Sequence, residues 1–151
     1  MDTPDSMKAE LGAWNNGAGI DLETWIGCEG RLSLAVGYCT IFWPEFVAFE
    51  GYVLIKGFSE AGLRSFERNP AATRQSVEAV MNHLHIEDIH AVRDDSSRDK
   101  IVFLGSVLKQ IYEAKLRWQF PDRTFTVEFF AHEPCDLSDY QLTFWQTGQT
   151  L

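Results

Sequence analysis

The chain has 151 residues, a mass of 17.2 kDa and a hydrophobic content of 45%, which is typical of one folded domain and unlike a disordered chain. Its 22 acidic and 13 basic residues give a formal net charge of −9, so its average field repels phosphate backbones and anionic lipids. Composition therefore argues against nucleic-acid and membrane partners and favours a protein partner with a basic surface.

The N-terminus and the cysteines indicate a cytoplasmic protein. The first eight residues have neither the positive segment nor the apolar segment of a secretory signal. Cys28, Cys39 and Cys135 are odd in number and not closely spaced, which does not fit the disulfide framework of a small secreted domain. We expect three reduced thiols, with Cys28 near a helix end and Cys39 in the core.

The first part of the chain divides into a polar end and two helical segments. Residues 1–12 lack periodicity and are predicted to be a flexible N-terminus, followed by one globular domain over 13–151. Asp21 can cap a short helix that ends at Gly27 or Gly30. Residues 31–43 alternate bulky and small side chains as a strand would, but they also fit a buried helix that ends before Pro44. We favour the helix.

Two β-hairpins are predicted, one before and one after the middle of the chain. The β-prone runs 46–49 and 52–55 are separated by Glu50-Gly51, a two-residue connection of the kind that closes a hairpin. Residues 125–129 alternate in polarity, and 140–147 are again β-prone, so the chain is expected to end in a second hairpin with a loop over 132–139.

Three helices are predicted between the hairpins. Ser59 starts a short one, which Asn69-Pro70 ends while starting the next, over 72–84. Ser96 and Asp99 resemble a capping box before a long helix that stops at Pro121. The expected buried stripes are Leu63 and Phe66; Val77, Val80, Met81 and Leu84; and Ile101, Leu104, Leu108, Ile111, Tyr112 and Leu116, with Lys109, Glu113 and Lys115 facing water.

This order of elements predicts an α+β fold. Two hairpins that bracket a helical middle suggest an antiparallel sheet of about four strands packed against several helices, one of them long. Strands do not alternate with helices along the chain, so parallel winding is disfavoured. We expect the helices to cover one face of the sheet.

The richest polar segment, residues 82–90, contains three of the four histidines and suggests a metal site. His83, Glu87 and His90 would share one face if the preceding helix ran on through His90, and imidazole with carboxylate suits zinc or iron. His83 and His85 would diverge on such a helix. The alternative, which we prefer, is that these are helix-end and turn residues and that the protein holds no metal or other cofactor.

Two further groups of residues are candidates for catalysis. His132 and Cys135 place an imidazole and a thiol in one loop, but no cysteine-hydrolase signature surrounds them. Glu45 and Glu50, set among Trp43 and Tyr52, could form an acid/base pair of the kind that sugar-cleaving enzymes use. Aromatic residues at strand spacing are more often core, and acids near a turn are more often solvated.

The sequence contains no nucleophile elbow, P-loop or dinucleotide fingerprint. We therefore expect a small, acidic, cytoplasmic interaction protein without catalysis, for example an inhibitor or immunity-type partner of a basic protein surface. Its candidate contact residues are Trp43, Glu45, Glu50 and Tyr52. The alternatives are a metal-dependent or hydrolase-like enzyme built on residues 83–90, and a small-ligand binder with an aromatic-lined pocket between sheet and helices.

Overall fold

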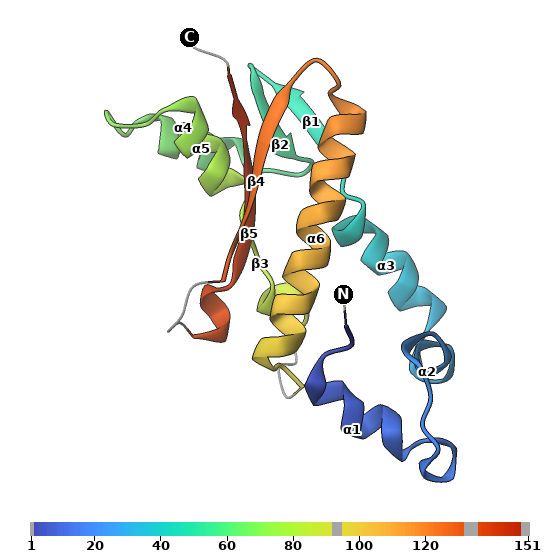
Figure 1. Cartoon of the computed structure of the whole chain (residues 1–151). Helices are drawn as coiled ribbons and strands as arrows, with labels where there is room; N and C mark the ends of the chain where they lie inside the picture. The colour runs from blue at the N-terminus through green and yellow to red at the C-terminus, as the bar shows by residue number, and fades with distance from the viewer. Residues whose placement is uncertain (1, 92–94, 132–135, 149–151) are drawn as a thin grey trace.

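A computed structural model describes residues 2–91, 95–131 and 136–148 (Figure 1). This part of the chain has an α+β fold, as predicted, with two antiparallel sheets of two and three strands and one long helix among six. The elements are α1 (Asp5–Ala13), the 3-10 helix η1 (Asn15–Gly17), α2 (Leu22–Glu29), α3 (Leu32–Phe42), β1 (Phe46–Phe49), β2 (Tyr52–Ile55), α4 (Glu60–Glu67), α5 (Arg74–Met81), β3 (Leu84–His85), η2 (Glu87–Ile89), α6 (Arg98–Gln119), β4 (Thr124–Phe130), η3 (Leu137–Asp139) and β5 (Gln141–Thr147).

The N-terminal third is helical. The Asp21 side chain caps α2 by accepting a hydrogen bond from the Thr24 backbone N–H at 2.7 Å, and Gly30 ends the helix. The predicted helix over residues 31–43 is also confirmed as α3, which stops at Phe42, two residues before Pro44. Residues 5–13 form α1, although their sequence shows no apolar periodicity, because contacts with α6 hold this helix in place.

Both predicted hairpins are present. In the first, β1 pairs with β2, and the turn residues Glu50 and Gly51 have φ angles of 49° and 88°. Two successive positive φ angles match the right-handed twist of the flanking strands, and glycine adopts this conformation without strain. In the second hairpin, β4 pairs with β5 over seven residues each.

The helix predicted over residues 72–84 is shorter than expected. It starts after Thr73, whose side chain and that of Ser76 form a capping box, and it ends at Met81. Our prediction that Leu84 continues the apolar stripe of α5 is therefore wrong. It lies in β3, a two-residue strand that pairs with Leu142 and Gln141 of β5.

Helices lie on two sides of the three-stranded sheet rather than on the one side that we expected (Figure 1). The 22-residue helix α6 packs on the face that carries Leu142 and Phe144, and its predicted stripe is largely confirmed. On the other side, α5 lies along β5, and α4 packs beside α5. The fully buried side chains of the α6 side include Leu108, Tyr112, Leu116, Leu142 and Phe144.

Two buried polar side chains, Glu78 of α5 and Asn82 at its C-cap, join the two sheets. The Glu78 carboxylate accepts hydrogen bonds from the backbone N–H groups of Val53 in β2 and Gln146 in β5, both at 2.7 Å. The Asn82 side chain accepts from the Ile55 N–H and donates to the carbonyls of Val53 and Phe144. These side chains occupy the edges of β2 and β5 where a further strand would otherwise pair.

None of the helices in the described ranges combines the length and the apolar character that crossing a membrane requires.

Candidate functional site

The structure separates the residues of the candidate metal site. The predicted site requires a helix that continues through His90, but α5 ends at Met81 and is followed by the strand β3 and the 3-10 helix η2. His83 Nδ1 contacts the Val80 carbonyl, whereas His90 Nε2 contacts the Tyr38 hydroxyl of α3. Because the helix is broken, His83 and His90 do not share a helical face.

The same break brings together two histidines that an unbroken helix would separate. The ring centroids of His83 and His85 lie 5.2 Å apart. His85 Nδ1 donates a hydrogen bond to the Ser138 carbonyl at 2.7 Å. Among the residues that the structure describes, no three His, Cys, Asp or Glu side chains form a group that could hold a metal ion.

The four candidate contact residues are spread over the first hairpin and its start. Trp43 follows α3 and is half-exposed, and Glu45 forms an ion pair with Lys56 at 2.7 Å. Glu50 lies in the turn at the other end of β1, where it pairs with Arg64 at 2.8 Å. The two glutamates are thus paired with different cations at opposite ends of a strand and do not form a common acid/base pocket.

Tyr52 lies at the turn end among charged residues of α4 and α5. Its hydroxyl donates to Glu67 Oε1 at 3.0 Å, and its ring lies 5.8 Å from the Arg74 guanidinium carbon. Burial and the hydrogen bond with Glu67 raise the pKa of Tyr52. The Arg64 guanidinium lowers the pKa of Glu67. The carboxylates of Glu50 and Glu67 at this end are thus both paired with Arg64 of the protein itself.

Neither cysteine in the described ranges is buried. Cys28 lies in α2 and Cys39 in α3, and both are exposed free thiols. Our expectation that Cys39 belongs to the core is wrong, because only the C-terminal residues of α3, Ile41 and Phe42, pack against the core, and Cys39 is exposed. His132 and Cys135 lie outside the described residues.

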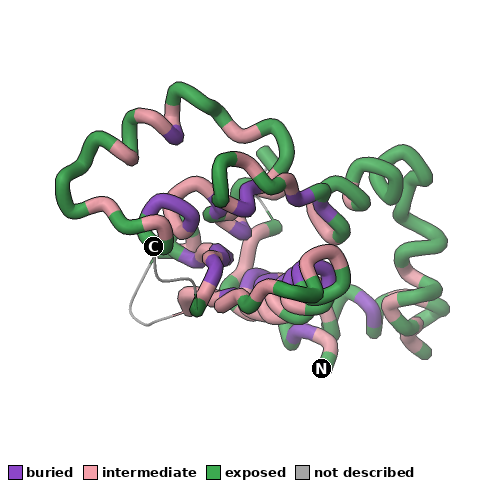
Figure 2. Tube along the Cα trace, turned by 90° about the horizontal axis from the view of Figure 1, so that it is seen from above, coloured by how far each residue is buried: buried purple, intermediate pink, exposed green. Residues whose placement is uncertain are grey.

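The largest departure from expectation is the exposure of α2 and of the first half of α3 within residues 5–43, which we call the N-terminal arm. Neither α2 nor α3 has a single buried residue, and most of this part of the trace is exposed in Figure 2. Leu32 is 84% exposed, Val36 66% and Leu34 47%. Leu32 and Leu34 point about 200° apart around a helix. The first half of α3 is therefore uncovered on opposite sides.

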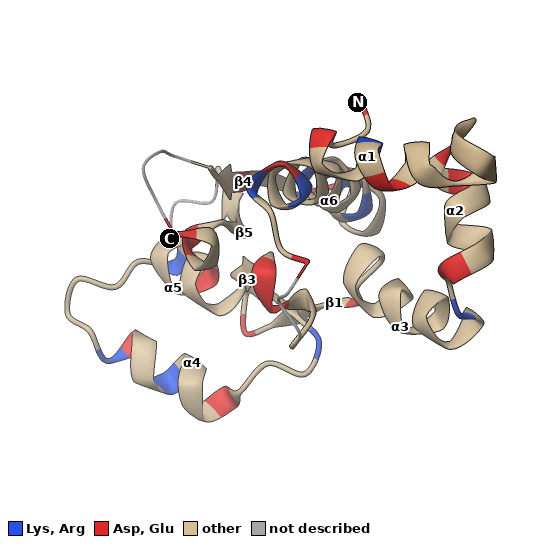
Figure 3. Cartoon of the chain, turned by 90° about the horizontal axis from the view of Figure 1, so that it is seen from below, with Lys and Arg blue, Asp and Glu red and all other residues tan. Residues whose placement is uncertain are grey.

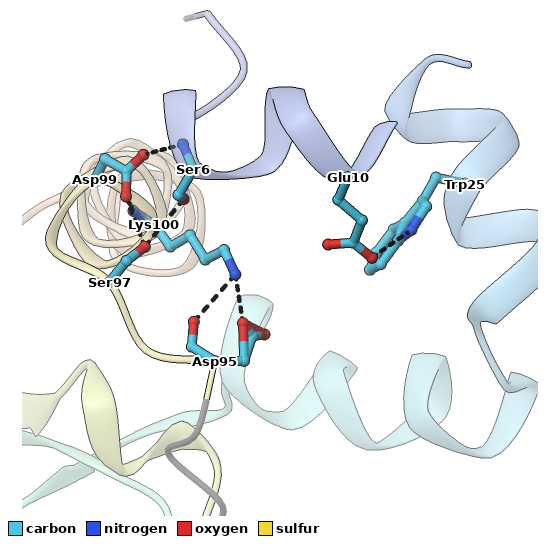
Figure 4. Close-up of polar contacts among 7 residues, drawn as sticks. All are labelled: Ser6, Glu10, Trp25, Asp95, Ser97, Asp99 and Lys100. Carbon is cyan, nitrogen blue, oxygen red and sulfur yellow. Dashed lines mark hydrogen bonds and ion pairs between the residues drawn. The ribbon is translucent and has the colours of Figure 1, made fainter. Parts of the chain in front are cut away.

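The N-terminal end of the arm is attached to the start of α6 (Figure 4). Asp99 Oδ2 accepts a hydrogen bond from the Ser6 backbone N–H at 2.7 Å, and Asp99 Oδ1 accepts from the Ser97 hydroxyl at 2.6 Å. These hydrogen bonds hold the pKa of Asp99 well below its usual range. Within the arm, the Trp25 indole N–H donates to Glu10 at 3.1 Å and connects α2 to α1.

The other end of the arm is attached through Lys115. We predicted that Lys115 faces water, but it is only 7% exposed. Its Nζ lies 4.8 Å from the ring centroid of Trp43 and 4.5 Å from that of Trp118, so the cation is held between two indole faces. Trp43 and Trp118 themselves remain 50% and 68% exposed. The arm is thus fixed at both ends of α6, while α2 and the first half of α3 stand away from it.

The helices α2 and α3 of the N-terminal arm differ in charge, and a cavity lies where they meet. The arm has five acidic and two basic residues, whereas α3 has none of either (Figure 3). A cavity of about 440 Å³ lies at the junction of α2 and α3, lined by Trp25, Ile26 and Leu34 with Glu29 and Arg31 at the connection. The sequence predicts that this helix is buried, whereas the structure leaves Leu32, Leu34 and Val36 exposed.

The attachment of α1 to α6 can be tested directly. Changing Asp99 to Ala removes the acceptor of the Ser6 N–H, so residues 5–13 should exchange their amide hydrogens at least several-fold faster while α6 stays protected. Hydrogen exchange followed by mass spectrometry measures this. Changing Asp122 to Ala, in an exposed position after α6, is the matched control. Unchanged exchange over 5–13 in the Asp99 variant would show that this hydrogen bond does not hold α1.

Searches against protein-family models, curated proteins and solved structures found no match to this chain.

Proposed function

We propose that this chain is a non-catalytic interaction protein, of the inhibitor or immunity type, that binds a protein partner through α2 and α3 of its N-terminal arm. The proposed partner surface is apolar at its centre and basic at its rim. The observation that carries this proposal is the exposure of an uncharged, apolar helix on opposite sides. Soluble proteins rarely leave a contiguous apolar patch uncovered, and large patches with polar rims typify interaction sites.

The arm has the composition of a binding surface. The centre of a protein interface is depleted of charge, and large apolar or aromatic side chains contribute most of its affinity. Leu32 and Val36 lie one helical turn apart on the same face of α3 and offer such side chains, and the α2–α3 cavity can take a large apolar side chain of the partner.

Charge supports a basic rim on the partner. Asp21, Glu23 and Glu29 belong to α2 and its cap, next to the apolar α3, and Arg31 is the one cation between Asp21 and Phe42. An acidic rim beside an apolar centre steers a basic surface toward the arm and accelerates association. The attachments to Asp99 and Lys115 hold the helices in position before binding, which lowers the entropic cost of ordering them.

Site-specific crosslinking tests the proposal. A photo-reactive phenylalanine analogue at Leu32 should crosslink to a discrete protein in the native cell. The same analogue at Phe66 of α4, which is 43% exposed contrary to our prediction that it is buried, is the control and should not. The crosslinked protein, once purified, should bind the unmodified chain, and Val36→Asp should weaken this binding at least tenfold while Ser65→Asp should not.

Salt dependence provides the second measurement. Raising ionic strength from about 0.1 M to about 1 M shortens the Debye length from about 10 Å to about 3 Å, so the association rate should fall steeply and the dissociation rate much less. An association rate that does not depend on ionic strength would contradict the proposal that the partner surface has a basic rim. Sedimentation of the purified chain checks for self-association. If it forms a dimer that Val36→Asp dissociates, the arm is a self-association surface and the proposal is wrong.

A further inference from the structure

A second concave surface, independent of the arm, lies between α5 and the three-stranded sheet. Side chains alternate along β5, so Leu142, Phe144 and Gln146 are buried toward α6 and the hairpin, whereas Gln141, Thr143 and Trp145 face the other way. These three residues and Phe130 of β4 line a groove whose opposite wall includes Ser76 and His83. Its volume is about 620 Å³, within the usual range of small-molecule sites.

The groove has a rigid frame. The Thr143 hydroxyl donates to the Ala79 carbonyl and ties the floor of the groove to α5. Beneath it, the buried Glu78 and Asn82 side chains hold α5 against the edge of β5. The walls are therefore connected by hydrogen bonds within the protein, and the separation between α5 and the sheet face is set before any ligand arrives.

Hydrogen-bonding groups in the groove match hydroxyl groups of a ligand. The donation by Thr143 leaves its oxygen lone pairs as acceptors. Because a carbonyl oxygen only accepts, His83 Nδ1 is the donor in its contact with Val80, and Nε2 of the neutral ring is an acceptor. The Gln141 side-chain amide forms no hydrogen bond with the described residues, so it offers both a donor and an acceptor.

The lining also determines the charge of the ligand. Among the described residues that line the groove, none is Asp, Glu, Lys or Arg. The described lining thus offers no counter-ion to a phosphate, carboxylate or ammonium group, which favours a neutral ligand. Trp145 and Phe130 instead supply aromatic rings, against which a flat or weakly polar ring can pack.

We propose that the groove between α5 and β5, with Gln141, Thr143, Trp145 and His83, binds a neutral, hydroxyl-bearing ring of the sugar class. The C–H face of the ring packs on Trp145. Its hydroxyl groups, each both donor and acceptor, pair with the Gln141 amide, the Thr143 oxygen and His83 Nε2. This site does not depend on the proposed function of the arm, which lies on the other side of α6.

Titration of the 15N-labelled protein with neutral sugars tests this site. The probes are methyl α-glucoside, methyl β-galactoside and N-acetylglucosamine, each raised to about 50 mM, because a single sugar ring in an open groove binds with a Kd on the order of mM. We expect at least one probe to shift the Trp145 indole N–H and the Gln141 side-chain N–H signals in a saturable way. Trp145→Ala should abolish the saturable shifts at Gln141. Trp118→Ala, which removes an equally large ring far from the groove, should leave them unchanged.

Three outcomes would overturn the proposal. One is the absence of saturable shifts in the groove with all three sugars. Another is saturable binding of glucose 6-phosphate but of none of the neutral sugars, which would show that the site selects a negative charge. The last is binding of adenosine at Trp145 without sugar binding, which would show that the groove recognises a flat base. Should Trp145→Ala unfold the protein, Gln141→Leu is the second variant, and it should weaken binding at least fivefold.

Discussion

Replacing Glu78 by Ala should lower the free energy of unfolding by about 3–5 kcal/mol. The Glu78 carboxylate is completely buried and accepts the backbone N–H groups of Val53 and Gln146, which belong to different sheets. Alanine leaves both donors buried without an acceptor, and each such group costs about 1–3 kcal/mol. Urea unfolding measures the change, and hydrogen exchange should show lost protection at the Val53 and Gln146 amides.

A glutamate of another helix provides the control. Glu113 of α6 is half-exposed and pairs with Lys109 at 3.0 Å, so Glu113→Ala should change stability by less than about 0.5 kcal/mol. If Glu78→Ala cost no more than this control, Glu78 would not be what joins the sheets. Glu78→Gln keeps the shape of the side chain and one acceptor oxygen but turns an N–H₂ group toward a backbone donor. Its free energy of unfolding should lie between those of the wild type and Glu78→Ala.

Replacing Leu108 by Ala should destabilise the fold by about 2–5 kcal/mol, as the truncation of a fully buried leucine does. Leu108 has no exposed surface and lies in the core between α6 and the three-stranded sheet. The lost side chain leaves a cavity that a close-packed interior fills only in part. Chemical denaturation of the purified variant tests this value.

The same substitution in the arm should have almost no effect on stability. Leu32 is 84% exposed, and alanine favours the helical state, so Leu32→Ala should change the free energy of unfolding by less than about 0.5 kcal/mol. A cost near that of Leu108→Ala would mean that α3 is covered in solution, as it would be in a dimer. Comparison of the two leucines thus distinguishes a core residue from a docking residue of the same type.

Elements specified by short-range chemistry were predictable from the sequence. Asp21 caps α2, Glu50-Gly51 closes the first hairpin, and the apolar repeat from Ile101 to Leu116 defines α6. Each of these signals acts between residues a few positions apart, so it operates in the same way wherever the segment lies in the fold. The α+β class followed from the order of such segments.

Other features depend on partners that are distant in the sequence. The end of α5 at Met81 and the short strand β3 depend on β5, about sixty residues later, whose edge Asn82 and Leu84 meet. Lys115 is buried because Trp43 lies across it. The sequence pattern of α3 is that of a buried helix, and only the tertiary arrangement shows that the described chain leaves its first half uncovered.

The candidate sites follow the same division. The sequence identified His83 and Trp43 as notable residues. In the structure, His83 shares a groove with Gln141 and Thr143, and Trp43 lies beside Lys115 and Trp118. These neighbours come from elements that the sequence pattern could not place in space. Periodicity reports which side of an element is apolar, and it contains no information on whether another element covers that side. Apolar character was therefore readable from the sequence, whereas its exposure, and with it the proposed interface, was decided by how the elements pack.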